Sequence, residues 1–141
     1  MKCLNLSNQN LTSLDCIEIP EDIEELRLHC NNLTELYFDE RFKNIKKINA
    51  DYNRITQIKG DTTNLEYLDC YMNQLTTLNN LNISNLKYLD CSNNQITTLN
   101  GFNAPNLKDL DCSINNLTTL NGFNASNLES LHCYHNRLIT L

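Results

Sequence analysis

The sequence has no long apolar stretch and is poor in basic residues. No part of its 141 residues approaches the ~18 consecutive apolar residues of a membrane span, and the N-terminus, MKCLNLSNQNLTSL, lacks the apolar run of a signal peptide. With 11 Lys and Arg against 17 Asp and Glu, the formal charge is −6, which argues against nucleic acid or an anionic membrane as a partner. We therefore expect a cytoplasmic protein.

The chain repeats itself along its whole length. Seven copies of the pattern Leu-x-x-Leu-x-Leu/Cys-x-x-Asn-x-Leu-x-x-Leu follow one another with offsets of 20 to 22 residues. Their first residues are Met1, Ile23, Ile45, Leu65, Leu86, Leu107 and Leu128. One such unit cannot bury its own apolar side, so neighbouring copies must stack into one continuous core. We therefore treat residues 1–141 as a single domain.

This pattern resembles that of the leucine-rich repeat family across essentially the entire chain. Cysteine at repeat position six and the 21-residue period make it similar to the short, irregular class found in bacteria and some large viruses. The resemblance implies an α/β-type, mostly β solenoid, a right-handed arc of seven repeats with a parallel sheet. It also implies a non-catalytic protein-interaction module, in the host cytoplasm if the source is a pathogen or a virus.

The spacing of apolar residues predicts the local structure. Apolar residues alternate at repeat positions four and six, which predicts a short strand with one buried face. The linkers between copies contain Gly101, Pro105 and several Asn residues, which oppose a regular helix. We expect 3-10 or extended structure on the convex side, one helical turn within 37–44, and Phe102 and Phe123 filling the core from that side.

Asparagine recurs in two columns. Position nine is Gln9 in the first copy and asparagine in the others, namely Asn31, Asn53, Asn73, Asn94, Asn115 and Asn136. An inward-facing amide can donate and accept hydrogen bonds at once, so we expect each one to tie its own turn to the next. A second column just before position one predicts the same role at the other edge: Asn44, Asn64, Asn85, Asn106 and Asn127.

The cysteines follow the repeat rather than a disulfide framework. Position six holds Leu6, Leu28, Ala50, Cys70, Cys91, Cys112 and Cys133, and free cysteine behaves as a small buried hydrophobe. Side chains in register keep Cβ atoms near 4.8 Å apart, whereas a disulfide needs ~3.8 Å. Four parallel thiols cannot surround a zinc ion. We predict free thiols, a reducing compartment, and no metal or cofactor.

Repeat positions three, five and seven should point away from the core and form the concave face. The candidate partner-binding residues are Tyr67, Asp69, Tyr71, Tyr88, Asp90, Asp109, Asp111, His132 and Tyr134. Three aspartates on neighbouring strands repel one another and raise each other's pKa, which a basic protein segment would relieve. Tyrosine suits interfaces because it has a rigid apolar body and a polar tip. We predict a concave face that binds a basic segment.

Two other interpretations of this face are open. Position five could simply tolerate a solvated aspartate, and the tyrosines could pair across strands to stabilise the sheet. A calcium site is disfavoured because a straight row offers too few oxygens. His132 has no nucleophile or carboxylate at a catalytic spacing, so we expect no enzyme.

The first and last copies show no polar cap of the kind that usually closes such arrays. Their apolar residues are Met1, Leu4, Leu6, Leu131, Leu138, Ile139 and Leu141. The alternative function is therefore a self-assembling protein that forms a homodimer or a stack through its terminal repeats. That the sequence is part of a longer protein is equally open.

Overall fold

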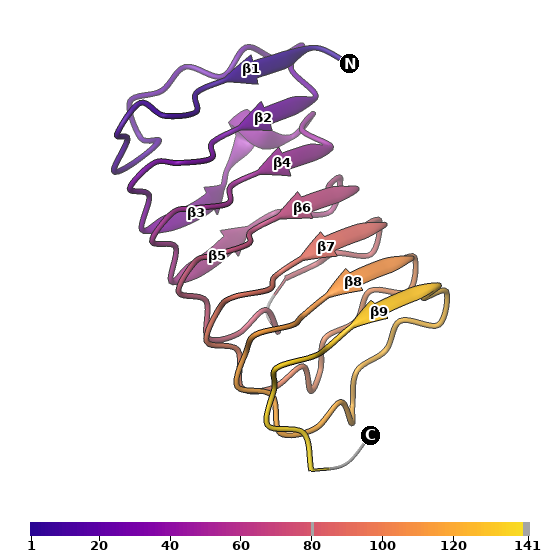
Figure 1. Cartoon of the computed structure of the whole chain (residues 1–141). Helices are drawn as coiled ribbons and strands as arrows, with labels where there is room; N and C mark the ends of the chain where they lie inside the picture. Colours follow the sequence, from indigo (N-terminus) through magenta and orange to yellow (C-terminus); the bar gives the residue numbers. More distant parts are fainter. Residues whose placement is uncertain (80, 140–141) are drawn as a thin grey trace.

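Each of the seven copies contributes one short strand to a single parallel sheet. The computed structural model describes residues 1–79 and 81–139. The strands are β1 (Cys3–Asn5), β2 (Glu25–Arg27), β4 (Lys47–Asn49), β6 (Tyr67–Asp69), β7 (Tyr88–Asp90), β8 (Asp109–Asp111) and β9 (Ser130–His132). They lie side by side in chain order, each in register with the next (Figure 1). The predicted solenoid is confirmed.

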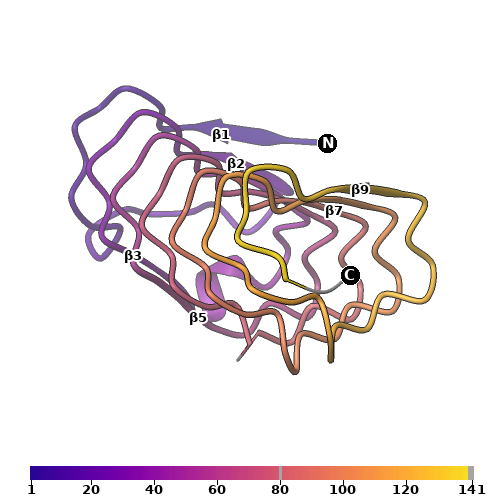
Figure 2. The same ribbon diagram turned by 60° about the horizontal axis from the view of Figure 1, so that its bottom comes forward.

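The core lies between this sheet and the return segments behind it. Seen from the C-terminal end, successive coils of the chain overlie one another with a gradual shift (Figure 2). The central residue of β4, β6, β7 and β8 is buried, while its two neighbours are half-buried on the outer face, as at Leu68, Leu89 and Leu110. This alternation is what repeat positions three to five predict. We call the outer side of the sheet, formed by repeat positions three, five and seven, the open face.

The convex side is largely irregular, as predicted. A 3-10 helix, η1 (Glu40–Phe42), forms inside the segment 37–44. The Asp39 carboxylate begins it by accepting a hydrogen bond from the Arg41 N–H at 2.9 Å. Phe102 is buried in the core, and Phe123 packs against it with ring centroids 5.6 Å apart.

A second, two-stranded sheet on the convex side was not predicted. β3 (Glu35–Phe38) pairs in parallel with β5 (Gln57–Gly60). The pairing depends on Gly60, whose φ is +93°, because a side chain there would collide with the Phe38 carbonyl oxygen. Within residues 1–79 and 81–139, no helix has the length and apolar character needed to cross a membrane.

The asparagine columns bind the repeats together through the backbone. The Asn94 Oδ1 accepts from the Leu75 N–H at 2.9 Å, and its Nδ2 donates to the Cys70 and Cys91 carbonyl oxygens at 3.0 and 3.1 Å. The predicted direction was wrong, because each side chain reaches back to the preceding repeat rather than forward. The second column also links neighbouring repeats, again in the backward direction: Asn44, Asn64, Asn85, Asn106 and Asn127 each donate to a carbonyl of the preceding repeat.

All seven cysteines are free, as predicted. Cys70, Cys91 and Cys112 are buried, and burial raises the pKa of each thiol, that of Cys112 to about 12. Their sulfur atoms lie 3.1 to 3.4 Å from carbonyl oxygens of the next repeat. The carbonyls are those of Asp90, Asp111 and His132, in that order. The column is therefore a packing element with inert thiols.

Candidate functional site

The aspartates of repeat position five are aligned on three neighbouring strands. Asp69, Asp90 and Asp111 end β6, β7 and β8 and are register partners of one another. Each carboxylate accepts a hydrogen bond from the backbone N–H two residues later, at 3.1, 2.9 and 2.9 Å. Side chains of this kind cap a backbone donor where the strand ends. Each aspartate therefore has a structural role at the end of its strand, and its contact with a partner stays a prediction.

The cap needs an acceptor oxygen, but it does not need a charge. Asn5 occupies the same repeat position on β1, and its amide Oδ1 accepts from the Ser7 N–H at 3.0 Å. A neutral side chain thus makes the bond that the three aspartates make. The carboxylates add three negative charges, about 4.8 Å apart from strand to strand, that the turn does not require.

Burial as well as repulsion acts on Asp69. The pKa of Asp69 is raised to about 6, mainly because the carboxylate is partly buried, and the charges of Asp51 and Asp90 add to the rise. The hydrogen bond from the Tyr71 N–H opposes it. Burial also raises the pKa of Asp51, against the lowering effect of His29. The sequence predicted the repulsion and missed the larger contribution of burial.

Acceptor oxygens outnumber donors beside Asp69. Among the described residues, Asn49 Oδ1 and Asp51 Oδ1 are buried without a hydrogen-bond partner. The Asn49 Nδ2 lies 3.4 Å from the Asp69 Oδ2, a long hydrogen bond. This part of the open face therefore holds oxygen atoms that an added donor would stabilise.

Two tyrosines stack face to face next to the aspartates. The rings of Tyr67 and Tyr88 stack with centroids 4.3 Å apart and planes 4° apart, which confirms pairing across strands. The Lys47 Nζ lies 4.5 Å from the centroid of Tyr67. Asp109 faces Tyr88 in register on β8. The column at position three thus runs from a lysine through two rings to a carboxylate.

The other predicted residues lie at the margins of this cluster. Tyr71 is half-buried, and Tyr52, which was not predicted, meets its ring edge-on at 5.3 Å. His132 continues the aspartate row in register with Asp111. Tyr134 is exposed in the last repeat and contacts His135, with centroids 5.4 Å apart.

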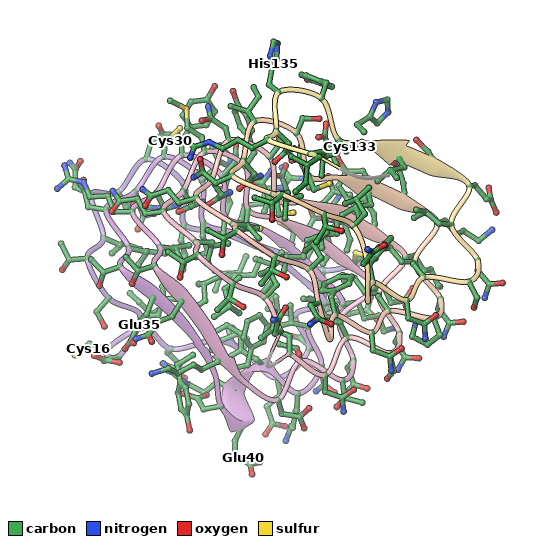
Figure 3. All side chains as sticks on the ribbon, turned by 90° about the horizontal axis from the view of Figure 1, so that it is seen from below. Cys16, Cys30, Glu35, Glu40, Cys133 and His135 are labelled. Carbon is green, nitrogen blue, oxygen red and sulfur yellow. The ribbon has the colours of Figure 1, made fainter. Side chains whose placement is uncertain are left out.

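Repeat position eight is a second column that the sequence analysis missed. All seven of its residues have φ between 52° and 58°: Asn8, Cys30, Tyr52, Met72, Asn93, Ile114 and His135. Figure 3 labels two of them, Cys30 and His135, along one edge of the molecule, with Glu40 at the opposite edge. The residue types share no pattern, so sequence reasoning had no signal for a common backbone conformation here.

The opposite edge of the sheet carries a groove in which lysines and glutamates form ion pairs. The groove has a volume of about 790 Å³ and is lined by the second asparagine column and by lysines and glutamates of position two. Lys46 pairs with Glu24, Lys87 with Glu66 and Lys108 with Glu129, at 2.6 to 2.8 Å. In the part of the chain that the structure describes, no ion pair holds the position-five aspartates.

Several apolar residues of the terminal repeats are exposed. Leu131 is 40% exposed, whereas Leu110, at the same repeat position, is fully buried. Met1 and Ile139 are also exposed, while Leu4, Leu6 and Leu138 pack partly against the core. Leu141 lies outside the described residues.

The sequence model of the family described as Leucine Rich repeats (2 copies) matches residues 63–104. That segment contains β6 and β7, whose geometry continues through the rest of the sheet. These observations support a leucine-rich repeat protein. Leucine-rich repeat domains are generally protein-interaction modules and are typically non-catalytic. Comparison with curated proteins finds no match. Across residues 1–79 and 81–139, no group of three His, Cys, Asp or Glu side chains is placed to hold a metal ion.

Proposed function

We propose that this leucine-rich repeat chain binds a basic segment of a partner protein on its open face. Asp69, Asp90 and Asp111 supply the charge, and Tyr67 and Tyr88 supply the apolar contact. The observation that carries the proposal is the hydrogen bond of Asn5, which performs the same capping role without a charge. Three aligned carboxylates therefore exceed what the turns need, and they favour a cationic partner.

The surrounding electrostatics support a cation from outside the chain. The lysines at the groove on the opposite edge are held by glutamates, so they do not neutralise the aspartate row. A lysine or arginine placed beside Asp69 would lower its raised pKa and offset the repulsion from Asp51 and Asp90. The half-buried rings of Tyr67 and Tyr88 add apolar contact beside the aspartates.

The test is a titration of a fluorescent, lysine-rich peptide of about a dozen residues at low ionic strength. We expect the triple variant Asp69→Asn, Asp90→Asn, Asp111→Asn to bind it at least tenfold more weakly, because asparagine keeps the cap and removes the charge. The matched control is Asp15→Asn, Glu18→Gln, Glu40→Gln, which removes three exposed charges outside the open face. If both variants bind the peptide equally weakly, net charge alone explains the loss of affinity, and the proposal is contradicted.

Self-association is a second candidate function, favoured by the exposed Leu131 and Ile139. We propose that copies meet through these terminal repeats. Light scattering under reducing conditions across a concentration series should then show a mass that rises toward a dimer or polymer. Leu131→Asn should hold the mass at that of a monomer, and an unchanged monomer mass of the unaltered chain at every concentration would contradict this candidate.

A further inference from the structure

Three exposed apolar side chains lie along the edge of the open face in repeats three, four and six, and the polar Asn93 lies between the last two of them. Tyr52, Met72 and Ile114 occupy repeat position eight and are 47%, 43% and 40% exposed. We call them the position-eight ridge. Each donates its N–H to a carbonyl of the next repeat at 2.9 to 3.1 Å. The backbone therefore holds the ridge in register with the strands.

The side chains of the ridge are poorly suited to their backbone conformation. A left-handed φ is uncommon for residues other than Gly and Asn, and it is most unfavourable for a β-branched residue such as Ile114. Asn8 and Asn93 adopt the same conformation in the same column. Asparagine would thus serve the backbone at every ridge position. Tyr52 also packs edge-on against Tyr71, and the exposed parts of the three side chains are left for contact with another molecule.

The ridge runs parallel to the aspartate row, and the distance between the two is about the width of an α-helix. Each column has one residue per repeat, and within a repeat they are three residues apart, so the columns are at most about 10 Å apart. An α-helix with its side chains is about 10–12 Å wide. One helix lying across the strands can therefore contact both columns.

The spacing along the stack also favours a helix over an extended segment. Repeats follow one another at ~4.8 Å, one helical turn advances 5.4 Å, and alternate residues of a strand advance about 6.6 Å. Over the two steps from Asp69 to Asp111, a helix drifts by only about 1 Å, whereas a strand drifts by almost 4 Å.

We infer that the partner segment is an amphipathic basic helix that lies along the stack of repeats. Basic side chains one turn apart face Asp69, Asp90 and Asp111, and the adjacent apolar stripe packs on the position-eight ridge. This inference rests on the proposed function and adds the conformation and the second contact. The occupant is a protein helix rather than an anionic membrane surface, which the aspartates would repel.

The test uses two designed peptides of the same composition. In the helical peptide, lysines at every third or fourth position lie beside a leucine stripe; in the second peptide, lysine and leucine alternate as in a strand. Both are titrated by fluorescence anisotropy against the unaltered protein, the ridge variant Tyr52→Asn, Met72→Asn, Ile114→Asn, and the aspartate variant Asp69→Asn, Asp90→Asn, Asp111→Asn. Tyr37→Asn, which alters an exposed tyrosine on β3, is the control.

We expect the helical peptide to bind the unaltered protein at least tenfold more tightly than the alternating peptide. The ridge variant should abolish that difference while its circular dichroism spectrum is unchanged, and the aspartate variant should weaken both peptides. If the two peptides bind equally and only the aspartate variant matters, the helix is refuted and the proposed function survives. If the aspartate variant binds both peptides as the unaltered protein does, both proposals are refuted.

Discussion

Asn94 and Asp90 belong to one repeat, and both accept a hydrogen bond from a backbone N–H. Asn94 is buried, and its amide oxygen and nitrogen both bond inside the protein, to Leu75, Cys70, Cys91 and Ser92. Asp90 is half-buried on the open face, where its carboxylate bonds Ser92 and still carries a charge. The asparagines recur because the backbone has the same requirement in each repeat from the second onward, whereas among the described residues the position-five cap forms at Asn5, Asp69, Asp90 and Asp111.

The difference lies in what remains once that requirement is met. At position nine the amide is buried and bonds to the backbone on both its oxygen and its nitrogen, as at Asn94, so the column stabilises the fold. At position five an amide suffices in the first repeat, through Asn5, and the aspartates of the middle repeats bring a charge beyond that. A residue type that recurs at one repeat position therefore indicates a structural role. A functional role is indicated by a property, here the negative charge, that the structural role does not need.

The largest effect on stability is expected from replacing an asparagine of repeat position nine. Asn94→Ala removes the acceptor of the Leu75 N–H and the donor to two buried carbonyls. Each unpaired buried group costs about 1–3 kcal/mol, so the free energy of unfolding should fall by about 3 kcal/mol or more. Urea denaturation measures this loss. Gln95→Ala, at the exposed neighbouring residue, should change stability by less than about 0.5 kcal/mol, and equal losses would contradict the account.

Removing the charge of an aspartate at repeat position five should stabilise the protein. The pKa of Asp69 is about 6 in the folded chain and about 3.9 when unfolded, so between these values the folded state binds more protons. Stability from this group therefore falls as the pH rises from about 4 to 6. Asp69→Asn should gain roughly 1–2 kcal/mol at pH 7, after allowance for solvent screening, and almost nothing at pH 4.

Urea denaturation at both pH values measures this gain. The matched control is Asp61→Asn, because hydrogen bonds from Thr63 lower the pKa of Asp61. Its stabilising contribution is present at pH 7 and lost as the pH falls through the folded pKa, so this substitution should not stabilise at pH 7. A loss of stability at pH 7 on Asp69→Asn would show that the charge serves the cap after all.

The fold could be predicted because the repeat forces it. Apolar spacing placed the strands of the large sheet, and identical spacing in each copy fixed the register that brings Asp69 beside Asp90. The β3–β5 pair escaped prediction because it depends on one backbone position, Gly60, at which a side chain would meet the Phe38 carbonyl. The direction of the asparagine bonds escaped because an amide can reach either neighbour.

The candidate site was predicted only as a set of columns. Register placed the tyrosines and aspartates together, but it could not show that the aspartates cap their own turns or that burial outweighs repulsion at Asp69. Both depend on how closely the strand end is packed. Position eight was missed because a left-handed φ appears at Tyr, Met and Ile there, residue types that do not normally signal it.

The smallest effect is expected at position eight, where the backbone and the residue type disagree. Ile114→Asn relieves the unfavourable φ of 53° of a β-branched residue, and it removes a side chain that is already 40% exposed. These effects oppose each other, and we expect a net gain of about 0.5–1 kcal/mol in urea denaturation. Ile139→Asn, at a more exposed residue, should give no gain. A loss of more than about 1 kcal/mol for Ile114→Asn would mean that the Ile114 side chain stabilises the core. Position eight would then have a structural role, like the asparagine column, rather than the binding role proposed for the aspartate row.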